Sequence, residues 1–192
     1  MIDFIRNYQS SLDAAMATVS HEKVALAIEW LREARDSGRS IFVAGNGGSA
    51  ATASHLVCDM VKGASYGKDR RFRMMALHDN LPTLTAYSND VDYTVAAVEQ
   101  LKNFAQPGDV LLTISGSGNS PNVVKAAEWA RAAGLKTIAL TGRDGGRLGP
   151  ASELEIRVAE PHMGRIEDAH MIICHMICYY FMDMERGSGC AG

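Results

Sequence analysis

The sequence predicts an α/β fold in which a parallel sheet is covered by helices on both faces. Short apolar segments alternate with longer segments of helical periodicity along most of the 192 residues. The short segments are apolar at successive positions, as expected for strands that are buried between two layers of helices. Hydrophobic residues make up 47% of the chain and charged residues 21%, which is ordinary for one globular domain of this length.

Two helices are expected at the start of the chain, over residues 2–18 and 21–37. In the second of them, apolar residues recur at helical spacing from Val24 to Ala34, and Gly38 supplies a stop. Strands and helices then alternate to the end of the chain. Strands are expected over 40–44, 72–77, 110–115, 136–141 and 154–158, and helices over 50–61, 81–88, 93–105, 121–133 and 165–184.

We expect a single domain over residues 1–192, made of a helical segment (1–38), an α/β core (39–186) and a disordered tail (187–192). The net charge of −3 provides no basic surface for nucleic acid, and no apolar run is long enough to span a membrane. The start of the chain lacks the pattern of a signal peptide, so the cytoplasm is the expected compartment. The four cysteines form no C-x-x-C pair; Cys174 and Cys178 are expected in the core and Cys190 in the tail.

Two loops rich in glycine occupy equivalent places in the predicted fold. "AGNGGSA" (44–50) and "SGSGNSP" (115–121) each join the end of a strand to the start of a helix, at the sheet edge where open parallel sheets bind ligands. The glycines let the backbone come close to an anion, and the N-terminus of the following helix adds partial positive charge. The hydroxyls of Ser115, Ser117 and Ser120 can donate hydrogen bonds to phosphate oxygens.

The composition of these loops favours a small phosphorylated ligand over a nucleotide. Neither loop contains a lysine, and neither fits the motifs G-x-x-x-x-G-K-[ST] or G-x-G-x-x-G. Ser49 and Ser120 are placed to cap the helices that follow. One such loop alone would more often be an ordinary capped turn, but two of them at equivalent strand ends favour anion binding.

Several residues of the predicted helices are candidate metal ligands. His55 and Asp59 are four residues apart, so they lie on one face of their helix. Glu167, His170 and His175 lie in the last helix, and His170 is interpreted as a surface or core histidine. One grouping joins His55, Asp59, Glu167 and His175, and such a set of two imidazoles and two carboxylates suits Zn²⁺, with another divalent ion as the alternative.

Four motifs together resemble the SIS (sugar isomerase) domain family, close to its phosphoheptose isomerase branch. They are "AGNGGSAATASH", "SGSGNSPNVV", "LTGRDGG" and "RIEDAHMIICH", and the resemblance extends over nearly the whole chain. It implies a flavodoxin-like three-layer sandwich. It also implies a homotetramer in which neighbouring subunits complete each active site and the segment 1–38 serves oligomerisation.

The resemblance also implies which residues contact a sugar phosphate. In the family the serine loop holds the phosphate, which here assigns that role to Ser115, Ser117 and Ser120. Gly116 departs from the family, which usually has threonine or a similar residue there. Other substrate-binding residues implied by the resemblance are Asn46, Gly47, Gly48, Ser49, Asp79, Thr85, Asn89, Asp90 and Glu167.

Two of the implied metal ligands differ from the family pattern of His, Glu, Gln and His. Asp59 stands at the Glu position, where its carboxylate falls short by about 1.5 Å if the backbone is unchanged. Glu167 stands at the Gln position and brings a negative charge. We interpret both as tuning of an active site that binds one Zn²⁺ per subunit, and loss of activity is the competing interpretation.

By this resemblance the protein converts sedoheptulose 7-phosphate to D-glycero-D-manno-heptose 7-phosphate through an enediol. Asp59 is assigned as the base, His175 as the acid/base partner at the sugar oxygens, and the metal as the electrophile. The carboxylate could instead leave the metal to act as the base. Two other functions stay open: isomerisation of another sugar phosphate, and a non-catalytic role as an adaptor or sensor. The retention of both His55 and His175 argues against the non-catalytic role.

Overall fold

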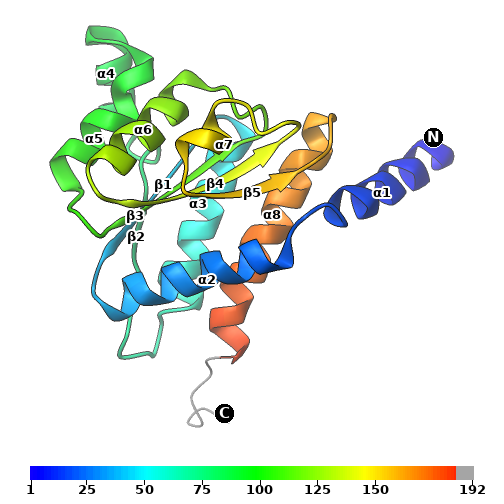
Figure 1. Ribbon diagram of the computed structural model, residues 1–192, viewed down its shortest axis with the longest axis horizontal. Coiled ribbons are helices and arrows are strands. Elements are labelled where there is room, and N and C mark those ends of the chain that lie inside the picture. Colours follow the sequence, from blue (N-terminus) through cyan, green and yellow to red (C-terminus); the bar gives the residue numbers. More distant parts are fainter. Residues whose placement is uncertain (185–192) are drawn as a thin grey trace.

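In the computed structural model, which describes residues 1–184, one five-stranded sheet has the strand order β2-β1-β3-β4-β5 (Figure 1). Every neighbouring pair of strands is parallel. This is the flavodoxin-like order, in which the strand sequence changes direction between β1 and β3. The strands are β1 (Ser40–Gly45), β2 (Arg73–Ala76), β3 (Val110–Ser115), β4 (Lys136–Gly142) and β5 (Leu154–Val158).

Helices cover both faces of this sheet, so the predicted three-layer α/β fold is confirmed (Figure 1). One face packs against α2, α3 and α8, and the other against α5, α6 and α7. The helix α1 projects from the α/β body and touches α8. The helices are α1 (Ile2–Met16), α2 (His21–Asp36), α3 (Gly48–Cys58), α4 (Leu81–Asp90), α5 (Ala96–Phe104), α6 (Pro121–Ala132), α7 (Leu148–Ala151) and α8 (Met163–Tyr179).

The central strand β3 shows why the strand segments are mostly apolar. All six of its residues are buried. Val110, Leu112 and Ile114 belong to the apolar cluster under α2, α3 and α8, whereas Leu111 belongs to the cluster under α5 and α6. Successive side chains of a strand point to opposite faces, so a strand with a helix layer on each side needs an apolar residue at nearly every position.

The boundaries of the helix that carries His55 differ from the prediction. The helix expected from residue 50 begins at Gly48, and a π-helical turn, η1 (Asp59–Gly63), continues it. The predicted N-cap Ser49 is wrong: Gly47 is the N-cap, and Ser49 lies buried in the first turn with its N–H donating to the Asn46 carbonyl at 2.9 Å. A 3₁₀ turn, η2 (Tyr93–Val95), precedes α5, and a π turn, η3 (Tyr180–Met184), follows α8.

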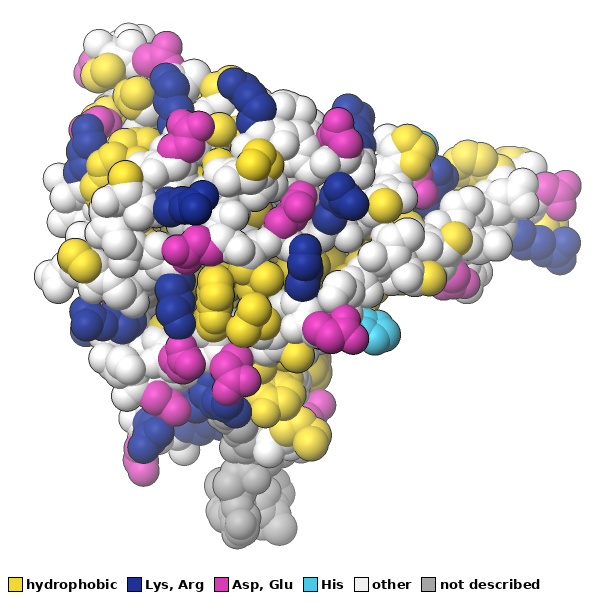
Figure 2. Space-filling model, in the orientation of Figure 1, with side chains coloured by type: hydrophobic (Ala, Val, Ile, Leu, Met, Phe, Trp, Pro, Cys, Tyr) yellow, Lys and Arg dark blue, Asp and Glu magenta, His cyan; other side chains and the backbone are white. Residues whose placement is uncertain are grey.

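The surface charges are mixed in sign (Figure 2), and the two cysteines that were predicted to lie in the core are buried. On the face drawn in Figure 2, Lys and Arg side chains are interspersed with Asp and Glu, and neither sign forms a large patch. None of the helices within residues 1–184 is long and apolar enough to cross a membrane. Cys174 and Cys178 are buried, as predicted, whereas Cys58 is exposed. Cys190 and the predicted tail lie outside the described residues.

His170 is a histidine of the core. It lies on α8 with no exposed surface, and its Nε2–H donates to the Thr141 carbonyl oxygen at 3.0 Å. Its Nδ1 is buried and has no hydrogen-bond partner among residues 1–184. Burial lowers the pKa of His170 from 6.5 to about 4, because the imidazolium ion would lose its hydration.

We therefore expect His170 to make the fold sensitive to acid. His170 binds a proton near pH 6.5 in the unfolded chain but only near pH 4 in the folded chain. The stability that neutral His170 confers on the fold is therefore present above pH 6.5 and is lost as the pH falls towards 4. The loss attributable to this residue is on the order of 3 kcal/mol. Urea unfolding between pH 7 and 4 should show a flatter pH dependence for His170→Gln than for the wild type; parallel curves for the two proteins would contradict this account.

Candidate functional site

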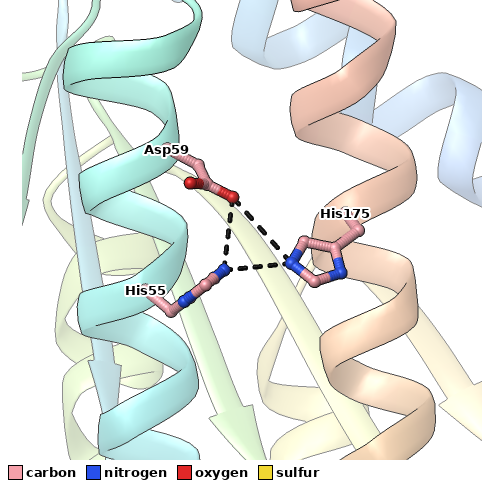
Figure 3. Close-up of side chains that lie close together, drawn as sticks. All are labelled: His55, Asp59 and His175. Atoms are coloured by element: carbon pink, nitrogen blue, oxygen red, sulfur yellow. Dashed lines mark hydrogen bonds and ion pairs between the residues drawn. The ribbon is translucent and has the colours of Figure 1, made fainter.

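His55, Asp59 and His175 form a compact cluster between α3 and α8 (Figure 3). The Nε2 atoms of His55 and His175 lie 3.0 Å apart. Oδ2 of Asp59 lies 3.3 Å from His55 Nε2 and 3.9 Å from His175 Nε2. The side chains of His55 and His175 are 47% and 43% exposed, and that of Asp59 is 24% exposed. A ligand from solvent can therefore reach all three groups.

The donor atoms of this cluster fit a divalent metal ion. A tetrahedral Zn²⁺ with bonds of about 2.05 Å holds its ligand atoms about 3.3 Å apart. The separations of 3.0, 3.3 and 3.9 Å between the Nε2 and Oδ2 atoms scatter around that value. Two imidazoles and one carboxylate are also the donor set of catalytic zinc sites that keep one position open. His55, Asp59 and His175 are thus the residues that would hold the ion.

Buried neighbours fix the positions of these three side chains. Leu56 and Met60 flank the His55–Asp59 pair on α3 and η1, and both are fully buried. On α8, Cys174 precedes His175 and is also fully buried. These anchors press α3 and α8 against the sheet and leave the cluster on the outer surface. Asp59 is the first residue of the π-helical turn, and such turns occur frequently at functional sites.

Cys174 and Cys178, which lie on α8 with His175, are core residues. Burial raises the pKa of the Cys178 thiol to about 12, and burial likewise raises the pKa of Cys174. Thiolates are the nucleophilic and metal-binding form of cysteine. Cys174 and Cys178 therefore stay protonated and pack as small apolar side chains.

Glu167, which the sequence placed among the metal ligands, lies elsewhere. The group of donor atoms within 4.8 Å of one another contains His55, Asp59 and His175 and not Glu167. The Glu167 carboxylate packs instead on Gly48, where an added Cβ would come within 2.6 Å of Oε1. Gly48 opens α3, so an anionic group here is favourable for the helix dipole. The carboxylate thus lies beside the first glycine loop.

The second loop, 115–120, has the features expected of a phosphate cradle. The Oγ atoms of Ser115 and Ser120 lie 3.3 Å apart. Ser120 is the N-cap of α6, yet its side chain makes no capping hydrogen bond; it shares a hydrogen bond with the Ser115 hydroxyl, so the pair keeps one hydroxyl proton for a ligand. Ser117 Oγ accepts from the Asn119 N–H at 3.1 Å and can still donate its own proton. These hydroxyls surround the positive end of α6.

A pair of asparagines joins the two loops. Asn46 Nδ2 donates to Asn122 Oδ1 at 2.8 Å, and Asn122 Nδ2 donates to Asn46 Oδ1 at 2.8 Å. The Tyr93 hydroxyl also donates to Asn46 Oδ1, at 2.6 Å. The amide of Asn46 therefore fixes the spacing of the loops. Sequence reasoning named Asn46 but missed Asn122 and Tyr93; the only signal for Asn122 was its place directly after Pro121.

Of the remaining residues named from the sequence, Asp79 lies in the turn between β2 and α4, and the others lie on α4. The Ser54 hydroxyl on α3 donates to the Asp79 carboxylate, so Asp79 is tied to the helix that carries His55. Asn89 and Asp90 lie at the end of α4, where Asn89 Nδ2 donates to Asp90 Oδ1 at 2.7 Å. Thr85, also on α4, donates to the Leu81 carbonyl at 2.9 Å. No contact within residues 1–184 brings Asn89, Asp90 or Thr85 to the cluster of His55, Asp59 and His175.

His78 supports the first loop and was also missed. It follows β2, and its Nδ1 accepts from the Gly45 N–H at 3.4 Å. Burial lowers the pKa of His78, since desolvation outweighs the hydrogen bond to Gly45 and the charge of Asp79. A neutral imidazole thus holds the end of β1, from which the loop 44–50 departs.

Comparisons with known proteins identify a family and several relatives of the chain. The SIS domain family matches residues 3–142 of the chain. The phosphoheptose isomerase of Geotalea daltonii is 36% identical over 181 residues, which are 93% of this chain and 94% of that protein. The phosphoheptose isomerase of Citrifermentans bemidjiense is 41% identical over 152 residues, 79% of each chain.

Two solved structures are similar throughout. The phosphoheptose isomerase from Francisella tularensis superposes with a TM-score of 0.88 at 28% identity and covers 95% of this chain and 98% of its own. The phosphoheptose isomerase from Neisseria gonorrhoeae superposes with a TM-score of 0.85 at 29% identity and covers 93% and 97%. The chain therefore belongs to the SIS domain family, within its phosphoheptose isomerase branch.

Proposed function

We propose that this protein is an aldose–ketose isomerase that converts sedoheptulose 7-phosphate to D-glycero-D-manno-heptose 7-phosphate. The observation that carries the proposal is the cluster of His55, Asp59 and His175 in a chain related to phosphoheptose isomerases over most of its length. An aldose–ketose isomerisation moves a proton between C1 and C2 through an enediol. It needs a base for the carbon-bound proton and an acid near the oxygens, and the cluster contains both types of group.

The dimensions of α3 suit a seven-carbon phosphate ester. His55 lies seven residues beyond Gly48 in the same helix, which is about 10 Å at 1.5 Å per residue. An extended heptose 7-phosphate also spans on the order of 10 Å between C1 and phosphorus, with bonds of about 1.5 Å. If the serine loop, which the Asn46–Asn122 pair ties to the loop before α3, holds the phosphate at the level of Gly48, then C1 and C2 lie at the height of the cluster.

In the proposed reaction Asp59 and His175 serve both as ligands of the ion and as proton-transfer groups, and the other residues bind the substrate. Asp59 removes the proton from carbon, and His175 moves a proton at the sugar oxygens. Ser115, Ser117 and Ser120 bind the phosphate, and this remote binding energy holds the reacting carbons in place. Glu167, beside Gly48, contacts the sugar chain. A bound divalent ion would supply Lewis-acid polarisation of the sugar oxygens.

We expect each chain to bind one divalent metal ion, which in the proposal is Zn²⁺. His55, Asp59 and His175 offer three ligands, and removing one imidazole leaves too few for tight binding. Protein prepared without chelator should contain about one equivalent of metal by plasma mass spectrometry. His175→Ala should lower this content by at least about tenfold, whereas His21→Ala, on the exposed start of α2, should not change it. Metal content that is equal in both variants would refute the ligand assignment.

The proposal includes a homotetramer and a cytoplasmic location. The helix α1 has one buried residue, Ala15, and it exposes Ile2, Phe4 and Ile5 at 62 to 70%. Apolar side chains on a projecting helix favour burial against another subunit. Cys58, Cys174 and Cys178 are free thiols, which is the usual state of cysteine in the reducing cytoplasm. Sedimentation equilibrium should give four times the chain mass of 20.7 kDa.

The decisive experiment is incubation of the protein with sedoheptulose 7-phosphate, followed by NMR of the anomeric protons. Appearance of a heptose aldose phosphate supports the proposal. Absence of product, together with turnover of a pentulose or hexulose phosphate, would replace the substrate and keep the reaction class. Absence of product from every ketose phosphate, with tight binding of one of them, would favour a sugar phosphate sensor.

A further inference from the structure

Gly116, the second residue of the serine loop (115–120), is buried beneath the start of α8. A Cβ at Gly116 would lie 2.6 Å from Sδ of Met163 and 3.4 Å from Cγ2 of Ile166, and both of these residues belong to α8. Ordinary van der Waals contacts of a Cβ begin at 3.4 Å. The Met163 thioether therefore fills the space that a side chain at position 116 would need.

The carbonyl group of Gly116 is also closely packed. A Cβ at Gly142, the last residue of β4, would lie 2.6 Å from the Gly116 carbonyl oxygen. The serine loop thus packs against the end of β4 and against the start of α8. Ile166 has no exposed surface, whereas Met163 is 38% exposed. Met163 can therefore be truncated without opening the apolar core, and its contact with Gly116 can be tested by itself.

Hydrogen bonds fix the backbone from which Met163 reaches the loop. Met163 is the first residue of α8, and His162 is the N-cap, whose Nδ1 accepts from the Arg165 N–H at 3.4 Å. Arg165 Nη2 donates to Glu160 Oε1 at 2.7 Å, and the His162 N–H donates to the same oxygen at 2.8 Å. The first turn of α8 is thereby connected to the segment after β5, so Met163 contacts Gly116 from a fixed position.

The contact between Met163 and Gly116 joins the two parts of the proposed site. The serine loop contains the hydroxyls that we propose for the phosphate, and α8 carries His175. One substrate molecule would touch both, so its placement depends on the spacing between this loop and this helix. Glycine has more conformational freedom to lose than any other residue, which leaves a loop less ordered unless a neighbour packs on it. The flexible thioether of Met163 supplies that packing.

We propose that Met163 is a positioning residue, which holds the serine loop in the conformation that binds the phosphate of the substrate. Met163 acts through Gly116 and not on the substrate itself. A loop that is not held must become ordered whenever the phosphate binds, and this cost is equal in the ground state and the transition state. Loss of Met163 therefore weakens binding without slowing the chemical step. The effect on the substrate rests on the proposed function; the effect on the loop does not.

The kinetic test compares three variants of exposed methionines. Met163→Ala should raise KM for sedoheptulose 7-phosphate at least about threefold, with kcat within about twofold of the wild-type value. Met163→Leu nearly conserves the side-chain volume and should restore KM. Met75→Ala is the matched control, because Met75 is 43% exposed on the edge strand β2, and it should change neither constant. A lower kcat with unchanged KM in Met163→Ala would refute the positioning role, and so would a KM in Met163→Leu as high as in the alanine variant.

A double-mutant cycle tests the contact itself. In Gly116→Ala the added methyl group meets the thioether and must push it aside, so KM should rise as it does in Met163→Ala. In Gly116→Ala/Met163→Ala the methyl group meets no thioether. The rise in KM of the double variant should therefore be smaller than the product of the two single effects, by at least about threefold. Single effects that simply multiply would contradict the proposal, because the two positions would then act independently.

Hydrogen exchange distinguishes failure of this proposal from failure of the proposed function. Amide exchange in peptides that cover residues 115–120, measured by mass spectrometry on the full-length protein, should be faster in Met163→Ala than in the wild type. Met163→Leu should return it to the wild-type rate. Unchanged exchange in Met163→Ala would overturn the proposal even in an active isomerase. Faster exchange in a protein that turns over no sugar phosphate would support the holding of the loop by Met163 and refute the proposed function alone.

Discussion

Replacing Asp59 with asparagine should lower kcat by about 10²- to 10⁴-fold, the usual contribution of a positioned general base. Asparagine is nearly isosteric with aspartate but cannot accept a proton from carbon. The loop 115–120, where we propose that the phosphate binds, is a different segment and is not altered by this substitution. We therefore expect KM for the sugar phosphate to stay within about threefold of the wild-type value. Steady-state kinetics with sedoheptulose 7-phosphate measure both constants.

Two controls separate the roles that Asp59 can play. Metal content of Asp59→Asn distinguishes a lost base from a lost ligand, since Oδ2 lies within 3.9 Å of both imidazole Nε2 atoms. Asp59→Glu keeps the carboxylate and lengthens it by about 1.5 Å, so it should retain most of the activity. Turnover of Asp59→Asn near the wild-type rate, with metal retained, would remove Asp59 from the mechanism.

The positions of the strands could be predicted because they depend on local patterns, whereas the flavodoxin-like arrangement of the sheet was indicated by the family resemblance. The β3 segment is apolar at four of its six buried positions, and the turn at Gly134 and the loop at 115–120 mark the ends of the next helix. The short helix α7 escaped prediction, because four residues of "LGPA" carry no periodicity. The π-helical turn at Asp59 also escaped, since its backbone is set by packing of Met60 in the core rather than by residue type.

The site could be predicted only in part, because some of its contacts depend on tertiary packing rather than on local spacing. His55 and Asp59 are four residues apart, so helical geometry alone brings them together. His175 joins them through the packing of α8 on α3, which only the family resemblance indicated. The same packing puts Glu167 against Gly48 instead of in the cluster. The link between Asn46 and Asn122 spans 76 residues, and a single sequence contains no signal for it.

The serine loop depends on a close contact that also escaped prediction. Gly118 has φ +62°, and a Cβ there would lie 2.1 Å from the Gly145 carbonyl oxygen. The Leu148 N–H donates to the Gly118 carbonyl at 2.9 Å, and Arg147 Nη2 donates to the Asn119 carbonyl at 3.0 Å. The loop after β4 thus supports the serine loop, which is the proposed phosphate cradle, and glycine is the residue that permits this approach.

Gly118→Ala should therefore damage both the fold and the cradle. The left-handed backbone costs an alanine about 1–2 kcal/mol, and the clash with a backbone oxygen adds about 1–3 kcal/mol. Gly38→Ala is the matched control, because Gly38 has φ +66° and open space around its Cβ position. Urea unfolding should show a loss at Gly118 that exceeds the loss at Gly38 by at least about 1 kcal/mol. KM should rise only for Gly118→Ala, since the displaced loop contains Ser117 and Ser120. Equal losses of stability in the two variants would mean that the loops can separate without cost, and the cradle would then not depend on the loop after β4.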